Sequence, residues 1–287
     1  MASLLDLRRR IRSVKNIQQI TRAMKMIAAG RLRRAQEEAM QARPYSEALR
    51  DIVSNLAQRM GERSHPLLEP REEKRVLLVV VTGDKGLCGS FNTNVIRRTT
   101  KEIAGFEEVE LLLLGNRASE FFKRREIPIR DSYTSIFSGV DADTAQEIAS
   151  DISAAFTDGE YDAVYVVYNQ FVSVLRQDLK LERLLPLQSV GGDGEAQAVE
   201  GSEYIFEPAP SDILEAVVES YVGSQIFRVL LESQASEHAA RMTAMDSATR
   251  NAGELIDSLT LSYNRSRQTA ITTELIEVVS GAQALQG

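Results

Sequence analysis

The chain has 287 residues, 43% of them hydrophobic and 26% charged, with a formal net charge of −7, which is typical of a folded globular protein and excludes a disordered one. No run of eighteen apolar residues occurs and the N-terminus lacks the apolar core of a secretory signal, so we expect a cytosolic or peripheral protein. The single cysteine, Cys88, excludes an internal disulfide and fits a reducing compartment.

The first predicted element is a long amphipathic helix within residues 1–60. Ser3 is its candidate N-cap, and its weak interior points are Gly30 and Pro44. Apolar residues recur mostly three or four positions apart, which gives one continuous stripe: Leu4, Leu7, Ile11, Val14, Ile17, Ile20, Met24 and Ile27.

This first arm is strongly basic. Residues 1–34 carry ten lysines and arginines against one acid, Asp6, a balance of about +9, so the remainder of the chain is near −16. Three explanations stay open at this point: a solvated polar helix face, an acidic protein partner, or nucleic acid.

The middle of the chain, residues 74–190, has the pattern of an α/β domain. Short apolar runs suited to buried parallel strands occupy residues 76–81 (VLLVVV), 109–114 (VELLLL) and 163–168 (AVYVVY). Helical segments are expected between them, near residues 92–103, 118–125 and 144–156. The alternation predicts a doubly wound sheet. Residues 191–210, which begin with Gly191 and contain GGDGEAQAVEGSE, are expected to form a flexible loop and a short foot segment.

The most suggestive short motif is TGDKGLCGS, residues 82–90, which follows the first strand. Glycine-rich loops there can hold phosphate at a helix N-terminus. The spacing is wrong for a P-loop, because Lys85 precedes the second glycine, and the GxxGxxG spacing does not match the dinucleotide fingerprint. His65 and His238 are far apart in sequence, and neither lies near Cys88. We therefore expect no catalytic, cofactor or metal site, and a structural or coupling protein.

The last element, residues 211–287, is predicted to be a second long helix. It contains no proline, and Ser211 after Pro210 is a candidate N-cap. At ~1.5 Å per residue, about 70 residues span on the order of 100 Å, whereas a compact chain of this length has a radius of gyration of about 19 Å. The helix must therefore project, or bend sharply, and the first arm is the obvious partner for a projecting helix.

The predicted seam of this helix pair is thin. Small and polar residues stand where a dimeric zipper would place Leu and Ile, and the expected inward positions are Ala239, Met242, Asp246, Thr249, Ala252 and Ile256. The polar residues of the outer face are Arg241, Asp246, Arg250 and Asn251.

Four segments in chain order resemble the γ subunit of F-type ATP synthase. They are IRSVKNIQQITRAMKMIAAGRLRRAQ (residues 11–36), TGDKGLCGSFN (82–92), EHAARMTAMDSATRNA (237–252) and ITTELIEVVSGAQAL (271–285). Gly83 stands where the family usually has serine. The resemblance extends over nearly the full length of the chain.

The resemblance implies an antiparallel coiled coil of the two terminal helices with a central Rossmann-like domain. It implies a rotor of the central stalk that couples ion flow through a membrane c-ring to ATP synthesis or hydrolysis on β, without a cofactor or catalytic site of its own. The implied partners are three α and three β subunits, the ε subunit and the c-ring. A single cysteine and the absence of a transit peptide suggest a bacterial type, peripheral on the cytoplasmic face of the inner membrane.

The resemblance also implies site residues. Positions matching the family's contacts with the α/β ring are Met24, Lys25, Arg241, Gln268, Thr272 and Glu274, and those matching its foot, which meets the c-ring and ε, are Tyr204, Phe206 and Glu207. Two other classes remain as alternatives. One is a coiled-coil nucleic-acid-binding protein using the basic arm, although residues 1–44 contain no aromatic side chain to stack on bases. The other is a nucleotide-dependent enzyme on the α/β domain.

Overall fold

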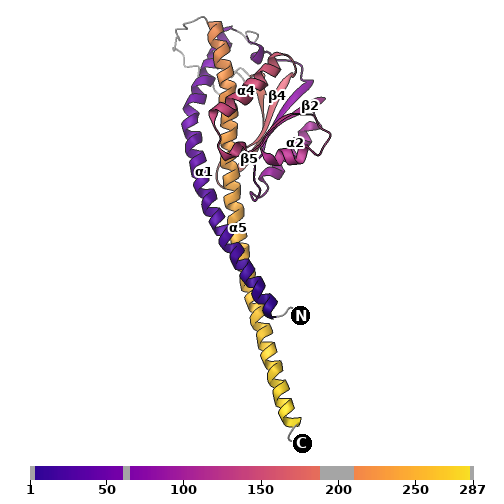
Figure 1. The fold of residues 1–287 in the computed structure, drawn as a ribbon. Helices are drawn as coiled ribbons and strands as arrows, with labels where there is room; N and C mark the ends of the chain where they lie inside the picture. Colours follow the sequence, from indigo (N-terminus) through magenta and orange to yellow (C-terminus); the bar gives the residue numbers. More distant parts are fainter. Residues whose placement is uncertain (1–3, 61–64, 188–209, 285–287) are drawn as a thin grey trace. The chain divides into compact units, whose positions relative to one another are not determined.

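The computed structural model describes residues 4–60, 65–187 and 210–284, and it divides into two compact units. We call Met1–Ala28 with Met242–Gly287 the helix-pair unit, and Ala29–Arg241 the α/β unit. Two long helices, labelled in Figure 1, contribute residues to both: α1 (Leu4–Met60) and α5 (Pro210–Ala284). Both predicted helices are confirmed.

In the helix-pair unit, α1 and α5 run antiparallel. Arg8 donates to the hydroxyl of Tyr263 at 2.8 Å, while Lys25 contacts Asp246 at 2.5 Å, so rising numbers on α1 meet falling numbers on α5. The buried residues of this seam are few and mostly small or polar: Leu7, Thr21, Ala28, Met245 and Ala252. The thin seam predicted from sequence is therefore present, and no helix of the described residues is apolar enough over a sufficient length to cross a bilayer.

The α/β unit is built on a five-stranded sheet with the order β3-β2-β1-β4-β5. Strands β1 to β4 are parallel and β5 is antiparallel to β4. The strands are β1 (Arg75–Val81), β2 (Glu108–Leu114), β3 (Ile129–Tyr133), β4 (Ala163–Phe171) and β5 (Gln177–Leu185). The shorter helices are α2 (Phe91–Ile103), α3 (Asn116–Phe122) and α4 (Ala142–Thr157), with 3-10 turns η2 (Pro66–Leu68) and η3 (Ile136–Ser138).

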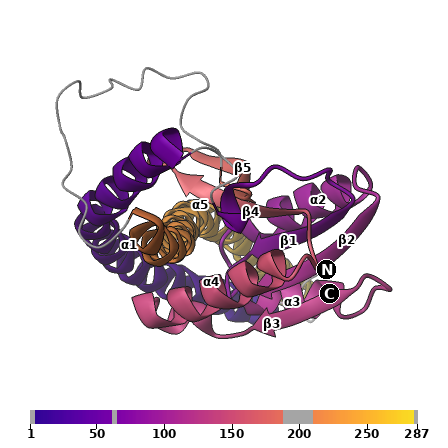
Figure 2. The same cartoon turned by 90° about the horizontal axis from the view of Figure 1, so that it is seen from above.

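The sheet is covered on both faces, which confirms the doubly wound prediction. Leu77, Val79 and Val81 of β1 pack with α4 and α5, whereas Leu78 and Val80 pack with α2 and α3. Figure 2 shows these layers from above, with α2 and α4 on opposite sides of the sheet. Because successive side chains of a strand point to opposite faces, the covered part of such a strand must be apolar, as residues 76–81 of β1 are.

Two strands were not predicted, β3 and β5, and both lie at edges of the sheet. Their sequences, IRDSY and QDLKLERLL, carry charges because neither strand is fully enclosed. The division predicted from sequence remains a prediction: two helical arms (residues 1–60 and 211–287), one α/β domain (74–190) and a loop with a foot segment (191–210). Residues 191–209, assigned to a flexible loop and foot segment, lie outside the described residues, as do Tyr204, Phe206 and Glu207.

Candidate functional site

The loop between β1 and α2, residues 82–90, is held by a dense set of hydrogen bonds at the carboxyl edge of the sheet. The carboxylate of Asp84 accepts backbone N–H groups from Asn116 at 3.1 Å, Ser135 at 3.0 Å and Phe137 at 2.9 Å. These amides follow strands β2 and β3, at the edge where α/β proteins commonly bind ligands. Asp84 therefore fills with its own carboxylate the position that a bound anion would take.

A second anchor of the loop is Asn92, in the first turn of α2. Its Oδ1 accepts the N–H of Gly83 at 2.8 Å, and its Nδ2 donates to the carbonyl of Lys85 at 3.2 Å and to the thiol of Cys88 at 3.2 Å. The loop is thus tied to both neighbouring elements, the sheet and α2.

Helix α5 closes over the same loop through a buried ion pair. Arg241 lies 2.5 Å from Glu237 one turn earlier, and their side chains are only 11% and 4% exposed. The Arg241 guanidinium also donates to the carbonyl of Gly86 at 3.3 Å. We call Glu237 and Arg241, together with the loop Gly83–Gly86 that they hold, the α5 clamp.

Two glycines of the loop are required for different structural reasons. A Cβ on Gly83 would lie 2.6 Å from Oε1 of Glu237, so this glycine permits the close approach of α5. The turn itself falls on Leu87 (φ 61) and Gly89 (φ 59), which adopt the left-handed conformation. Gly89 adopts this conformation without a steric penalty, whereas for Leu87 the conformation is strained. The side chain of Leu87 is 64% exposed. The loop therefore presents a strained apolar side chain at the surface.

The end of α5 in the helix-pair unit has an exposed apolar surface. Beyond Tyr263, which accepts a hydrogen bond from Arg8 of α1, several large side chains are about half exposed or more: Ile271, Leu275, Ile276, Val278 and Val279. No described residue buries them. Soluble chains rarely leave such a run uncovered, so this end of the helix is a candidate surface for a protein partner.

Comparison with known proteins shows the family of the chain. A family model described as ATP synthase matches residues 3–285. An ATP synthase gamma chain of Prosthecochloris aestuarii is 47% identical, and one of Pelotomaculum thermopropionicum is 48% identical, each over 100% of both chains. The chain belongs to the ATP synthase γ chain family.

Solved structures show the same fold. A chain of the Tetrahymena thermophila mitochondrial ATP synthase central stalk and c-ring matches with a TM-score of 0.64 and 27% identity, over 80% of this chain and 99% of that one. A chain from the Euglena gracilis mitochondrial ATP synthase, at 18% identity, covers 98% of this chain and 94% of its own length with a TM-score of 0.70. The fold class predicted from sequence is thereby confirmed.

The predicted contact residues of this chain do not form one cluster. Gln268, Thr272 and Glu274 are exposed on the end of α5, where the hydroxyl of Thr272 donates to the carbonyl of Gln268 at 2.9 Å. Met24 and Lys25 are half-buried on α1, and Lys25 is ion-paired with Asp246.

One sequence prediction about this chain was wrong. Arg241 was expected on the exposed face of α5, but its side chain is turned into the α5 clamp. The reason is that α5 has a second neighbour at this level, the β1–α2 loop, which a two-helix pattern does not contain. The spacing Glu237–x₃–Arg241 opposite a GxxG loop is the signal that could have found the clamp.

The alternative of a nucleic-acid-binding protein gains nothing from these comparisons. Several of the basic residues behind it are already engaged within the chain. Lys25 pairs with Asp246, Arg33 with Glu37, and Arg34 with Glu38. No group of three or more metal-ligating side chains occurs within residues 4–60, 65–187 and 210–284.

His238 lies beside the α5 clamp and is expected to stay neutral at physiological pH. Burial, followed by the nearby charges of Arg241 and Arg31, lowers its pKa to about 4. Because arginine can only donate, the 3.2 Å contact from Arg241 makes Nδ1 of His238 the acceptor and places the proton on Nε2.

The low pKa of His238 makes the free energy of unfolding depend on pH. The unfolded chain takes up the proton near the ordinary histidine pKa of about 6.5, whereas the folded chain does so only near 4. Stability should therefore fall by roughly 3 kcal/mol in total as the pH drops through this window. Urea titrations of the parent and of His238→Gln at a series of pH values measure this. The pH slope should be shallower in the variant, and equal slopes would contradict the assignment.

Cys88 should react slowly in the folded chain. Its side chain is buried, and burial, reinforced by the charge of Glu237, raises the pKa of the thiol above its ordinary value. Since the thiolate is the reactive form, we expect disulfide exchange with an aromatic disulfide reagent at least ~10-fold slower than in the chain unfolded by guanidinium chloride. Equal rates would show that the loop opens freely.

Proposed function

We propose that this chain is the γ subunit of a bacterial F-type ATP synthase, where it is the rotor of the central stalk. Ion flow through a membrane c-ring would turn it, and its rotation would drive ATP synthesis or hydrolysis on the β subunits. The observation that carries the proposal is the full-length family match together with an antiparallel helix pair whose α5 end has an exposed apolar surface.

The physical basis of the proposed coupling is differential contact. A helix pair is asymmetric about its own axis, so it would touch each of three β subunits with a different face. Only contacts that differ between states can shift a conformational equilibrium, and this asymmetry supplies them. A thin seam, with polar residues such as Arg250 and Asn251 exposed beside it, suits a shaft that must turn in its surroundings without being held.

The proposed partners are three α and three β subunits, the ε subunit and the c-ring. We infer that the α/β ring is met by Met24 and Lys25 on α1 and by Gln268, Thr272 and Glu274 on α5. Arg241 belongs to the same inferred set, although its contribution would come through the small exposed part of its side chain and through the loop that it holds. Tyr204, Phe206 and Glu207 are proposed to meet the c-ring and ε.

We further infer that the chain has no catalytic site of its own and that ATP is made and hydrolysed on β. The filled anion position at Asp84 supports this inference for the β1–α2 loop. The complex would be peripheral, on the cytoplasmic face of the inner membrane.

Reconstitution tests the proposal. The purified chain is mixed with α and β subunits of the same organism, the complex is isolated, and ATP hydrolysis is followed with and without the chain. One copy per three α and three β subunits, with hydrolysis that depends on this chain, is the expected result. In the same assay the double variant Gln268→Ala/Thr272→Ala should lower activity, whereas Glu254→Ala, exposed on the same helix, should not. If the chain does not assemble with the α and β subunits, the proposal is wrong.

A further inference from the structure

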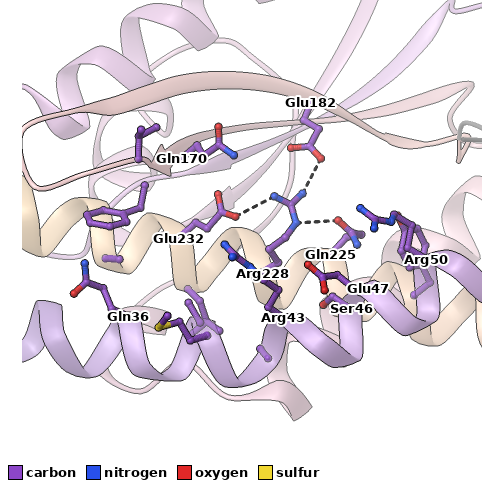
Figure 3. Close-up of a pocket in the computed structure, with 18 residues that line it drawn as sticks. Gln36, Arg43, Ser46, Glu47, Arg50, Gln170, Glu182, Gln225, Arg228 and Glu232 are labelled. Carbon is purple, nitrogen blue, oxygen red and sulfur yellow. Dashed lines mark hydrogen bonds and ion pairs between the residues drawn. The ribbon is translucent and has the colours of Figure 1, made fainter. Parts of the chain in front are cut away.

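A cavity of about 810 Å³ lies within the α/β unit between α1, α5 and the ends of β4 and β5. It is separate from the α5 clamp and shares no lining residue with it. Its volume falls in the range of small-molecule sites, roughly 300–1,000 Å³. Figure 3 shows its walls, with Arg43, Glu47 and Arg50 contributed by α1 and Arg228 and Glu232 by α5.

The end of the cavity away from Arg50 is lined by Gln36 and Gln170, labelled in Figure 3, as well as by apolar side chains. The apolar lining residues include Leu231 of α5, which is buried, and Phe171 of β4. Met40 on α1 is 72% exposed and Val172, just after β4, is 48% exposed, so two walls offer uncovered apolar surface to the same space. Small residues, Ala39 among them, keep this end open.

The other end is polar, and the arginine on its α5 side already has hydrogen-bond partners. The guanidinium of Arg228 donates to Glu182 at 2.7 Å, Gln225 at 3.0 Å, the hydroxyl of Tyr168 at 3.0 Å and Glu232 at 3.3 Å, as the dashed lines of Figure 3 show in part. These bonds use four of the five N–H donors of the guanidinium, so Arg228 is a fixed part of the wall.

The α1 side carries an excess of positive charge. It contributes Arg43, Glu47 and Arg50, and Arg50 has only a 3.6 Å contact, with its neighbour Asp51. Arg43 makes no hydrogen bond or ion pair with any described residue; its charge acts on Glu232 across the cavity. Seven residues apart, or about 10.5 Å along the axis, the two arginines lie on the same face of the helix, and both line the cavity.

Glu232 adds an unused polar atom between the two ends. Its Oε2 is buried and has no hydrogen-bond partner among the described residues. Burial raises the pKa of this carboxyl, which favours its protonated form, and a protonated carboxyl can donate to an anion. The buried atom and the arginines of α1 therefore favour the same kind of ligand head group.

We propose that this cavity binds an amphipathic carboxylic acid. The carboxylate lies against Arg43 and Arg50, and the hydrocarbon chain runs along Met40, Phe171 and Leu231. The site is independent of the rotor function, because it uses none of the residues inferred to contact partner subunits.

Titration calorimetry of the full chain with dodecanoate, below its micelle concentration, tests the proposal. Saturable binding of one molecule per chain is expected, and dodecyltrimethylammonium, with the same tail and the opposite charge, should bind at least ~10-fold more weakly. Equal binding of the two amphiphiles, or binding that does not saturate, overturns the proposal.

Matched variants locate the site. Arg43→Gln should weaken dodecanoate binding about tenfold, whereas Arg33→Gln, an exposed arginine of the same helix outside the cavity, should leave it unchanged. Ala39→Phe, which fills the end away from Arg50, should also weaken it, and circular dichroism verifies that each variant is folded. Binding that neither Arg43→Gln nor Ala39→Phe weakens contradicts the assignment to this cavity.

Discussion

Replacing Arg241 with methionine is expected to destabilise the α/β unit by about 3–5 kcal/mol, the usual cost of leaving a buried charge unpaired. The side chain of Glu237 is 4% exposed and Arg241 is its ion-pair partner at 2.5 Å. Methionine keeps the length and apolar stem of the side chain but leaves the carboxylate of Glu237 without its counter-charge. Urea unfolding followed by circular dichroism measures the loss.

The pH dependence of this variant identifies the cause. Burial already raises the pKa of Glu237, and removing Arg241, which opposes that shift, raises it further. The folded state then binds a proton at a higher pH than the unfolded chain, whose glutamate titrates near 4.5. The penalty of Arg241→Met should therefore be largest above the folded pKa and shrink as the pH falls toward 4.5.

A double variant provides the control. Glu237→Gln combined with Arg241→Met removes the buried charge and should recover at least half of the lost stability. If Arg241→Met alone leaves stability unchanged, the guanidinium points to solvent in solution and the α5 clamp does not exist.

Gly115→Ala should be at least as damaging, with a loss of more than about 4 kcal/mol or a failure to fold. A Cβ at this position would lie 1.9 Å from the backbone carbonyl oxygen of Thr82, and the residue has a φ of +101°. The carbonyl cannot move away easily, because Thr82 is fixed by hydrogen bonds from its N–H to Leu114 and to its hydroxyl from Ala118.

Two other glycines separate the clash from the backbone conformation. Gly159 has a φ of +76°, and an added Cβ would meet no atom within 4 Å, so Gly159→Ala should cost only ~1–2 kcal/mol. Gly30 lies inside α1, also with open space, so Gly30→Ala should stabilise by about 0.5–1 kcal/mol. Chemical denaturation of the three variants should give this order, and a Gly115→Ala loss no larger than that of Gly159→Ala would contradict it.

The strands that could be predicted from sequence are those that contain a long, mostly apolar run. Residues 76–81, 109–114 and 163–168 each lie within a strand of the described sheet because those strands are buried from both sides. β5 could not be found in this way, since its burial is only partial and its charged residues pair with neighbours, as Glu182 does with Arg228. A pattern method detects burial, and an edge strand is not fully buried.

The long helices were predictable for a similar reason: residues 211–287 contain no proline. In the first helix, by contrast, a proline did not mark the end of the helix, because α1 continues through Pro44 to Met60. Proline removes one backbone donor and disfavours a helix without forbidding it where the surroundings compensate. Val53 and Leu56, beyond Pro44, pack into the core of the α/β unit and stabilise this stretch.

The candidate site was predicted least well where it depends on tertiary contacts. Nothing local in the sequence distinguishes Asp84, which fills the strand-edge position, from an ordinary loop acid. The cavity beside Arg228 likewise gathers residues from α1, α5 and two strands, so no single segment could reveal it. The motif TGDKGLCGS indicated the place, and the folded chain was needed to show that Glu237 and Arg241 hold it.

The central claim is that this chain turns inside an ATP synthase, and observation of single molecules tests it most directly. A fluorescent rod is attached through Lys123→Cys, an exposed position on the α/β unit, to complexes held on a surface by their β subunits. The buried thiol of Cys88 should not compete for the label. On addition of ATP we expect continuous rotation in one direction. Complexes that hydrolyse ATP while the rod stays stationary would contradict the account.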